Sequence, residues 1–127
     1  MTFVITPGGE NAPSATLTLT SQRVDDVAVI TVDGLLDATT REQFAGYLSQ
    51  TSPPMIVDLA GVTFMDSRAL ALIVQSWQRA TASGGRFALV GVDYAHSKVM
   101  WITGLAQLLP LYNTLEEALA ALLQDRP

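Results

Sequence analysis

The sequence predicts an α/β fold with a mixed central sheet of about five strands and about four helices. Near the N-terminus, two strand-like segments flank Asp25-Asp26, which predicts an antiparallel hairpin. Beyond this hairpin, short apolar segments alternate with helix-like ones, and helical crossovers make the later strands parallel. The chain has 127 residues, of which 49% are hydrophobic and 15% charged. This is enough apolar material for one core, so we expect a single domain.

The segment 1–15 precedes the expected domain, which covers 16–127. It contains Pro7-Gly8-Gly9 and Pro13, which are turn-forming residues. We interpret this segment as a flexible N-terminal extension, with Phe3-Val4-Ile5 as an alternative edge strand.

The domain begins with the two strands of the hairpin. Thr16–Thr20 alternates polar and apolar residues with period two, which predicts a half-buried strand. Asp25-Asp26 forms the turn. Val27–Val32 is more fully apolar and is expected to be more deeply buried.

A helix and a central strand follow the hairpin. Asp37 or Thr39 is expected to cap a helix that runs to about Ser49. After a proline-containing break, Met55–Leu59 predicts a short, central strand, and Asp58 is interpreted as a turn former at its end.

The second helix is expected at Ser67–Ala82, because its apolar residues share one face and Ser83-Gly84-Gly85 follows it. Phe87–Val90 predicts another buried strand. Tyr94–Ile102 predicts a third helix, with Gly104 as its C-terminal stop.

The last two elements are an edge strand and a helix. Leu108–Tyr112 contains Pro110, which cannot donate a backbone hydrogen bond and therefore favours an edge position. The final helix starts near Asn113-Thr114 and runs to about Gln124. Its first turn carries Glu116 and Glu117, which interact favourably with the helix dipole.

Composition excludes several classes of function. There is no cysteine, so the chain has no disulfide, thiolate metal site or cysteine nucleophile. The formal net charge of −5 disfavours nucleic acid as a partner. No apolar stretch is long enough to insert into a membrane and no signal peptide is recognisable, so we expect a cytoplasmic protein. One histidine and scattered carboxylates give no metal-ligand spacing, and we expect no cofactor.

Ser67 is the most informative candidate for a functional residue, since it starts a helix directly after Asp66. A helix N-terminus carries unpaired N–H groups that stabilise an anion, so a hydroxyl there is suited to accept a phosphate. The simpler interpretation from these residues alone is that Ser67 or Asp66 caps the helix, which contributes about 0.5–2 kcal/mol.

The remaining residues with reactive or aromatic side chains have structural interpretations. A nucleophilic serine needs a neighbouring base, and His96 lies in a different predicted helix, so we expect no catalytic site and no enzyme. Trp77 and Trp101 are interpreted as core residues, with an interaction patch as the alternative for Trp101.

The run at 58–67, DLAGVTFMDS, resembles the signature of the STAS domains, the bacterial anti-sigma factor antagonists. In that family the pattern is D-L-x-x-V-x-F-[MI]-D-S-[ST]-G-L. Three more segments resemble family segments in the same order, and together the matches span about Thr16 to Leu123: Asp33–Asp37, Gly84–Phe87 and Val99–Leu105. The resemblance implies a STAS-like fold with helices packed mainly on one face of the sheet.

The resemblance also implies a function. Ser67 falls on the family's regulatory phosphorylation site, and the surface that binds the partner would comprise Asp37, Asp66, Ser67, Arg68 and Ala69. The unphosphorylated protein would bind an anti-sigma factor of the serine kinase class and release it on phosphorylation of Ser67. A PP2C-type phosphatase would restore binding. A homodimer is left open.

Two departures from the family pattern leave an alternative. Arg68 stands where the family has Ser or Thr, and Ala69 stands where it has Gly. Arg68 could pair with a phosphate on Ser67 or change which kinase accepts the site. The alternative is a STAS-type accessory subunit of an ABC transporter, which would bind the transporter ATPase without phosphorylation.

Overall fold

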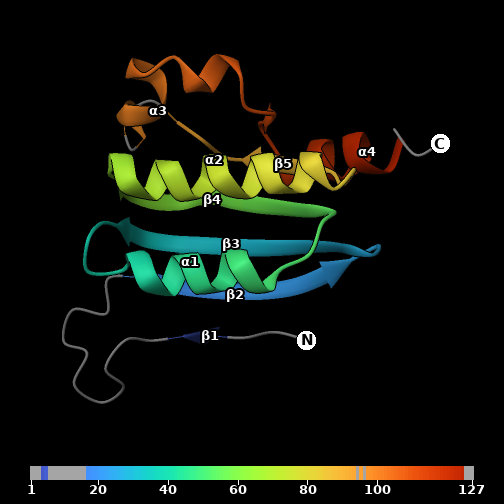
Figure 1. Ribbon diagram of the computed structural model, residues 1–127, viewed down its shortest axis with the longest axis horizontal. Coiled ribbons are helices and arrows are strands. Elements are labelled where there is room, and N and C mark those ends of the chain that lie inside the picture. The colour runs from blue at the N-terminus through green and yellow to red at the C-terminus, as the bar shows by residue number, and fades with distance from the viewer. Residues whose placement is uncertain (1–3, 6–16, 94, 96, 125–127) are drawn as a thin grey trace.

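The computed structural model describes residues 4–5, 17–93, 95 and 97–124. Its central feature is a six-stranded sheet with strands in sequence order (Figure 1). The elements are β1 (Val4–Ile5), β2 (Leu17–Val24), β3 (Val27–Leu36), α1 (Arg41–Gln50), β4 (Met55–Met65), α2 (Ser67–Ala82), β5 (Phe87–Val90), α3 (Lys98–Ile102), a 3-10 turn (Leu105–Gln107), β6 (Leu111–Tyr112) and α4 (Leu115–Gln124).

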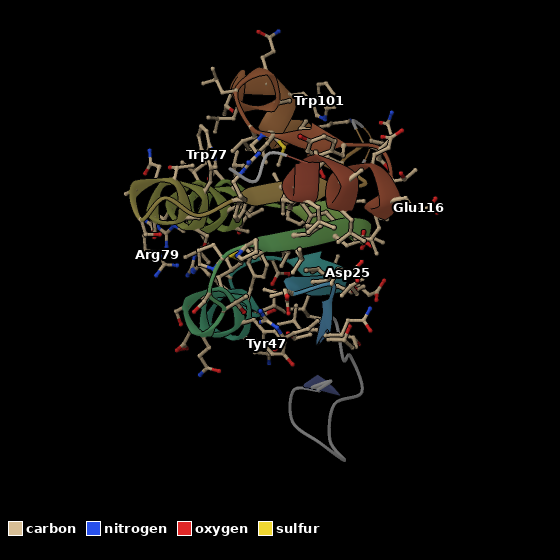
Figure 2. All side chains as sticks on the ribbon, turned by 90° about the vertical axis from the view of Figure 1, so that its right-hand side faces the viewer. Asp25, Tyr47, Trp77, Arg79, Trp101 and Glu116 are labelled. Carbon is tan, nitrogen blue, oxygen red and sulfur yellow. The ribbon has the colours of Figure 1, made fainter. Side chains whose placement is uncertain are left out.

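The sheet is mixed, as predicted. β1, β2 and β3 pair antiparallel, whereas β3, β4, β5 and β6 pair parallel. α1, α2 and α3 contribute side chains to the larger core cluster, and α4 contributes to a smaller, separate one. Figure 2 shows α1 and α2 on one side of the sheet and α4 on the other. The helices therefore lie mainly on one face.

Alternation along the central strands explains how the sheet supports two cores. In β3, Ala28, Ile30 and Val32 belong to the larger cluster, while Val27 and Val29 belong to the cluster beneath α4. Side chains alternate between faces along a strand, so a strand covered on both faces is apolar throughout. This is why β3 and β5 lack the polar alternation of an exposed strand.

The N-terminal hairpin forms as predicted, but both strands are longer: β2 ends at Val24 and β3 at Leu36, beyond the predicted Thr20 and Val32. Asp25 and Asp26 have φ angles of 52° and 68°, the left-handed pair that a tight two-residue turn requires. The alternative of an edge strand near the N-terminus is confirmed at Val4–Ile5, which pairs with β2. The rest of the predicted flexible extension, 1–3 and 6–15, lies outside the described residues.

The predicted end of the central strand at Leu59 is wrong, because β4 is 11 residues long and continues to Met65. Asp58 is consequently not a turn former. It lies within β4, and its carboxylate accepts a hydrogen bond from the Ala60 N–H at 3.0 Å. The pairing of β3 with β4 shifts register twice beyond this point, so the polar, glycine-containing stretch is an irregular strand rather than a turn.

Three other boundaries differ from the prediction. The N-cap of α1 is Thr40 and not Asp37 or Thr39. The described helix α3 begins at Lys98, whereas the prediction started it at residue 94. Residues 94 and 96, of which 96 is the lone histidine, lie outside the described residues. β6 has only two residues, Leu111–Tyr112, because the preceding Pro110 has no N–H to donate.

The second and fourth helices agree closely with the prediction. α2 spans Ser67–Ala82, and Gly84 adopts the left-handed conformation just beyond it, with φ 80°. At the start of α4, Thr114 Oγ1 accepts the Glu117 N–H at 3.1 Å and the Glu117 carboxylate accepts the Asn113 N–H at 3.2 Å. These reciprocal bonds satisfy N–H groups that the helix leaves unpaired.

Candidate functional site

The candidate site lies where β3 and β4 end side by side. Leu36 and Met65, the last residues of these parallel strands, are paired. The Asp66 N–H extends the contact by donating to the Leu36 carbonyl at 3.0 Å. Asp37 and Asp66 therefore leave the same edge of the sheet, at the end where α1 and α2 begin (the left of Figure 1).

Asp66 is the N-cap of α2. Its backbone is extended, with φ −94° and ψ 175°, and its Oδ1 accepts the Ala69 N–H at 2.9 Å. Its carbonyl accepts the Leu70 N–H at 3.1 Å, which is the first bond of the helix. The sequence left open whether Ser67 or Asp66 caps the helix, and the structure shows that Asp66 does.

Ser67 is the first residue of α2 and is exposed. Since Asp66 supplies the cap, the Ser67 hydroxyl is not required for that task. The N-terminal N–H groups and the dipole of a 16-residue helix favour negative charge beside it. The geometry thus presents an exposed hydroxyl at a position that tolerates a phosphate.

Asp37 is held by its own loop. Its Oδ1 accepts hydrogen bonds from the Thr39 hydroxyl at 2.6 Å and from the Thr39 N–H at 2.9 Å. The Thr40 hydroxyl donates to the Leu35 carbonyl at 2.8 Å, which fixes the turn between β3 and α1. The hydrogen bond from the Thr39 hydroxyl lowers the pKa of Asp37 below its ordinary value of 3.8, so this carboxylate is ionised at neutral pH.

The two residues that depart from the family pattern occupy different environments. Arg68 is exposed and available at the surface beside Ser67. Ala69 is fully buried, with 0% of its surface exposed, so its side chain cannot touch a partner. It belongs to the core beneath the site, and its contribution to the predicted surface is limited to the N–H that binds Asp66.

An open groove of about 550 Å³ adjoins Ser67 between the end of β4 and α3. The sequence alone does not indicate this groove, because the predicted strand ends at Leu59 and nothing in the sequence pattern places α3 beside Phe64. Two of its side chains are exposed apolar residues, Phe64 at 48% and Ile102 at 75%. The lining residues are Thr63, Phe64, Met65, Asp66, Ser67, Ala95, Lys98, Val99 and Ile102.

The two tryptophans also differ in environment. Trp77 is half-buried and packs against the larger core cluster, as predicted. Trp101 is 41% exposed, so its interpretation as a core residue is wrong. Figure 2 shows Trp101 on the α3 segment, above α2 and Trp77.

Among the residues that the structure describes, no group of three or more histidine, cysteine, aspartate or glutamate side chains is arranged to hold a metal ion. Within the same ranges, none of the helices combines the length and hydropathy needed to cross a bilayer.

Comparison with known proteins identifies the family to which this chain belongs. The STAS domain model matches residues 18–118, and the chain belongs to the STAS domain family. The resemblance inferred from the sequence motifs is therefore confirmed.

Individual relatives are consistent with this assignment. The chain is 29% identical over 114 residues to the anti-sigma-F factor antagonist RsfA of Mycobacterium tuberculosis, covering 85% of this chain and 89% of RsfA. The crystal structure of an anti-sigma factor antagonist from Mycobacterium paratuberculosis superposes with a TM-score of 0.77 at 28% identity, covering 84% of this chain and 94% of that one. SpoIIAA in its unphosphorylated form has the same fold, with a TM-score of 0.69 at 23% identity over 86% of this chain and 99% of SpoIIAA.

Proposed function

We propose that this protein is an anti-sigma factor antagonist that works by partner switching. In its unphosphorylated form it binds an anti-sigma factor of the serine kinase class, and phosphorylation of Ser67 ends that binding. The observation that carries the proposal is an exposed serine at the first position of α2, directly after a capping aspartate. The names of its relatives support the same function.

The proposed modification is a phosphoryl transfer from ATP. The Ser67 Oγ attacks the γ-phosphorus, the bond from that phosphorus to the β,γ-bridging oxygen breaks, and ADP leaves with the electron pair. In this proposal a base of the kinase takes the hydroxyl proton. A PP2C-type phosphatase reverses the change by hydrolysis, which releases inorganic phosphate.

Charge explains why such a modification would end binding. A phosphoserine carries about −1.5 to −2 charges at neutral pH. Beside the Asp66 carboxylate, the phosphate makes this part of the surface strongly negative. A partner surface that fits a neutral serine would then face charge repulsion and the cost of desolvating the phosphate. The helix N-terminus stabilises the same charge from within, so the fold survives while the interface is lost.

In this proposal the protein is a ligand and a substrate, and not a catalyst. It acts in the cytoplasm on protein partners and does not contact nucleic acid, which its net charge of −5 disfavours. Asp37, Asp66, Ser67 and Arg68 form the surface that the anti-sigma factor contacts, with the backbone N–H of Ala69 holding the cap.

The test is binding of purified anti-sigma factors from the source organism, measured by calorimetry with and without ATP. We expect the wild-type protein and Ser67→Ala to bind one of them, and Ser67→Glu to bind at least roughly tenfold more weakly. Mass spectrometry after incubation with ATP should find phosphate on Ser67. Ser49→Glu is the matched control, because it adds the same charge on an exposed position of α1.

Two results would contradict the proposal. One is equal binding by wild type and Ser67→Glu. The other is binding to the ATPase of an ABC transporter by both forms, which would favour an accessory subunit that needs no phosphorylation.

A further inference from the structure

Exposed large apolar side chains are found at the end of β4 and in the segment 98–108. Within the residues that the structure describes, four large hydrophobic side chains are strongly exposed: Phe64 at 48%, Trp101 at 41%, Ile102 at 75% and Leu108 at 66%. One lies at the end of β4, and the other three lie in the segment 98–108. Phe64 and Ile102 share the lining of one groove, and apolar surface gathered in this way marks an interaction site more often than scattered single residues do.

The segment 98–108 is anchored, and yet it presents apolar residues outward. Met100 is completely buried and Leu109 is 95% buried, which fixes the segment against the larger core cluster. The Thr103 N–H bonds the Val99 carbonyl at 3.1 Å, and the turn after α3 is closed by Gly104 at φ 81°. The exposure of Trp101 and Ile102 is therefore set by a packed helix.

Phe64, at the end of β4, and Ile102, in α3, both line the groove that also contains Ser67. They come from segments 38 residues apart, and the fold brings them together beside Asp66 and Ser67. A partner that reaches Ser67 must cover this groove, because Ser67 is itself part of its lining.

We propose that the groove beside Ser67 receives an apolar side chain of the anti-sigma factor, and that Phe64 and Ile102 determine the affinity and choice of that partner. This inference rests on the proposed function. The occupant is the kinase-class partner, since a kinase that brings the γ-phosphate of ATP to the Ser67 Oγ necessarily places its surface over the adjoining walls.

The same arrangement gives phosphorylation a second effect on binding. An apolar occupant removes water from the groove, and a phosphate on its rim must keep its water or find donors to replace it. A dianion beside Asp66 therefore opposes the entry of an apolar side chain. Binding should bury apolar surface and give a negative heat-capacity change that phosphorylation abolishes together with binding.

The experiment uses the full chain and the purified anti-sigma factor that binds the wild-type protein. Calorimetry at several temperatures compares wild type with Ile102→Asp and Phe64→Ser. We expect both variants to bind roughly tenfold more weakly or worse, and Ile102→Leu to bind like wild type. Leu108→Asp is the matched control, because Leu108 is also a strongly exposed apolar residue but does not line the groove.

Folding of each variant is checked by circular dichroism and thermal unfolding. Because Ile102 is 75% exposed, its replacement should leave the melting temperature nearly unchanged. Full affinity in both Ile102→Asp and Phe64→Ser would overturn this inference while leaving the proposed function intact. Failure of the wild-type protein to bind any anti-sigma factor would overturn the proposed function and this inference with it.

Discussion

Asp66 connects the end of the sheet with the start of α2. Its N–H binds the Leu36 carbonyl at 3.0 Å, and its carboxylate binds the Ala69 N–H at 2.9 Å. The side chain before the candidate phosphorylation site is therefore part of the scaffold as well as of the surface. This dual role gives a stability prediction that is independent of any partner.

Asp66→Ala should lower the free energy of unfolding by about 0.5–2 kcal/mol, because it removes the N-cap hydrogen bond. Asp66→Asn keeps an acceptor oxygen and should retain most of the wild-type stability. Urea unfolding followed by tryptophan fluorescence measures both variants. If Asp66→Ala is as stable as the wild type, the cap is not contributing as the geometry indicates.

Asp37 gives a pH prediction at the same scale. Its pKa in the folded protein lies below the ordinary 3.8, chiefly because of the Thr39 hydroxyl. The carboxylate therefore contributes stability above pH 3.8, and this contribution is lost as the pH falls through the folded-state pKa.

Thr39→Val removes the hydroxyl and should raise the pKa of Asp37 toward 3.8. Carbon NMR of the Asp37 carboxyl during an acid titration measures this directly. The stability difference between Thr39→Val and wild type should shrink as the pH falls below 3.8. An unchanged pKa in the variant would show that the hydroxyl does not cause the shift.

Two glycines show how local geometry controls the elements. Gly91 follows β5 with φ 75°, and a Cβ built there would lie 2.7 Å from the Cα of Ala60 in β4. Gly46 lies within α1, and no atom is within 4 Å of its added Cβ. The same substitution should therefore have opposite effects at these positions.

Gly91→Ala should destabilise the protein by more than about 2 kcal/mol, since the new methyl group is both conformationally strained and too close to backbone. Gly46→Ala should stabilise it by about 0.5–1 kcal/mol, because alanine is the better helix former. Thermal and urea unfolding of the two variants side by side test this. Similar stabilities for both variants would contradict it.

The helix α2 has local determinants and could be predicted closely, whereas the second half of β4 depends on pairing and could not. The bounds of α2 follow from its apolar face, its acidic cap and the glycines after it, all of which are visible in the sequence. The second half of β4 was missed because its strand character comes from pairing with β3 across two register shifts. Ala60-Gly61 resembles a turn until that partner strand is placed beside it.

The candidate site also contains residues that could be identified from the sequence and residues that could not. Asp66 and Ser67 are sequence neighbours at a helix start, so they could be identified without a structure. The part of the groove lining that contains Ile102 reaches them only after the chain has passed through α2 and β5. The burial of Ala69 also depends on how α2 lies against the sheet.

At the scale of the molecule, the buried hydrophobic residues of the described chain form two separate core clusters. The larger one supports the candidate site, and the smaller one lies beneath α4 (Figure 2). Ser67 is exposed at the margin of the larger core, and its modification should leave both cores unchanged. Stability and binding should therefore be separable by substitution.

Ser67→Glu should keep the wild-type circular dichroism spectrum and unfold at nearly the wild-type temperature, because the helix dipole accommodates the added charge. Its affinity for the anti-sigma factor should nevertheless fall, as stated above. A large drop in melting temperature would mean that loss of binding reflects unfolding instead of charge.

Leu122→Ala should have the complementary effect. Leu122 is 97% buried in the cluster beneath α4, so its truncation should cost about 2–5 kcal/mol of unfolding free energy. Binding measured well below the lowered melting temperature should equal that of the wild type, because none of the residues that line the groove belongs to the cluster beneath α4. A loss of affinity in the folded variant would indicate that this cluster and the groove are coupled.

The groove beside Ser67 is lined by two segments that are distant in the sequence, 63–67 and 95–102. This arrangement bears on how a cell could prevent cross-reaction between related regulators of this kind. One side of the groove carries Ser67, the residue that we propose a kinase modifies, and another part of its lining comes from the segment 98–108. Sequence change in that segment can alter which protein docks without altering the acceptor serine or its cap. Gene duplicates that share one phosphorylation chemistry could thus be insulated from each other by divergence confined to a single short stretch of chain.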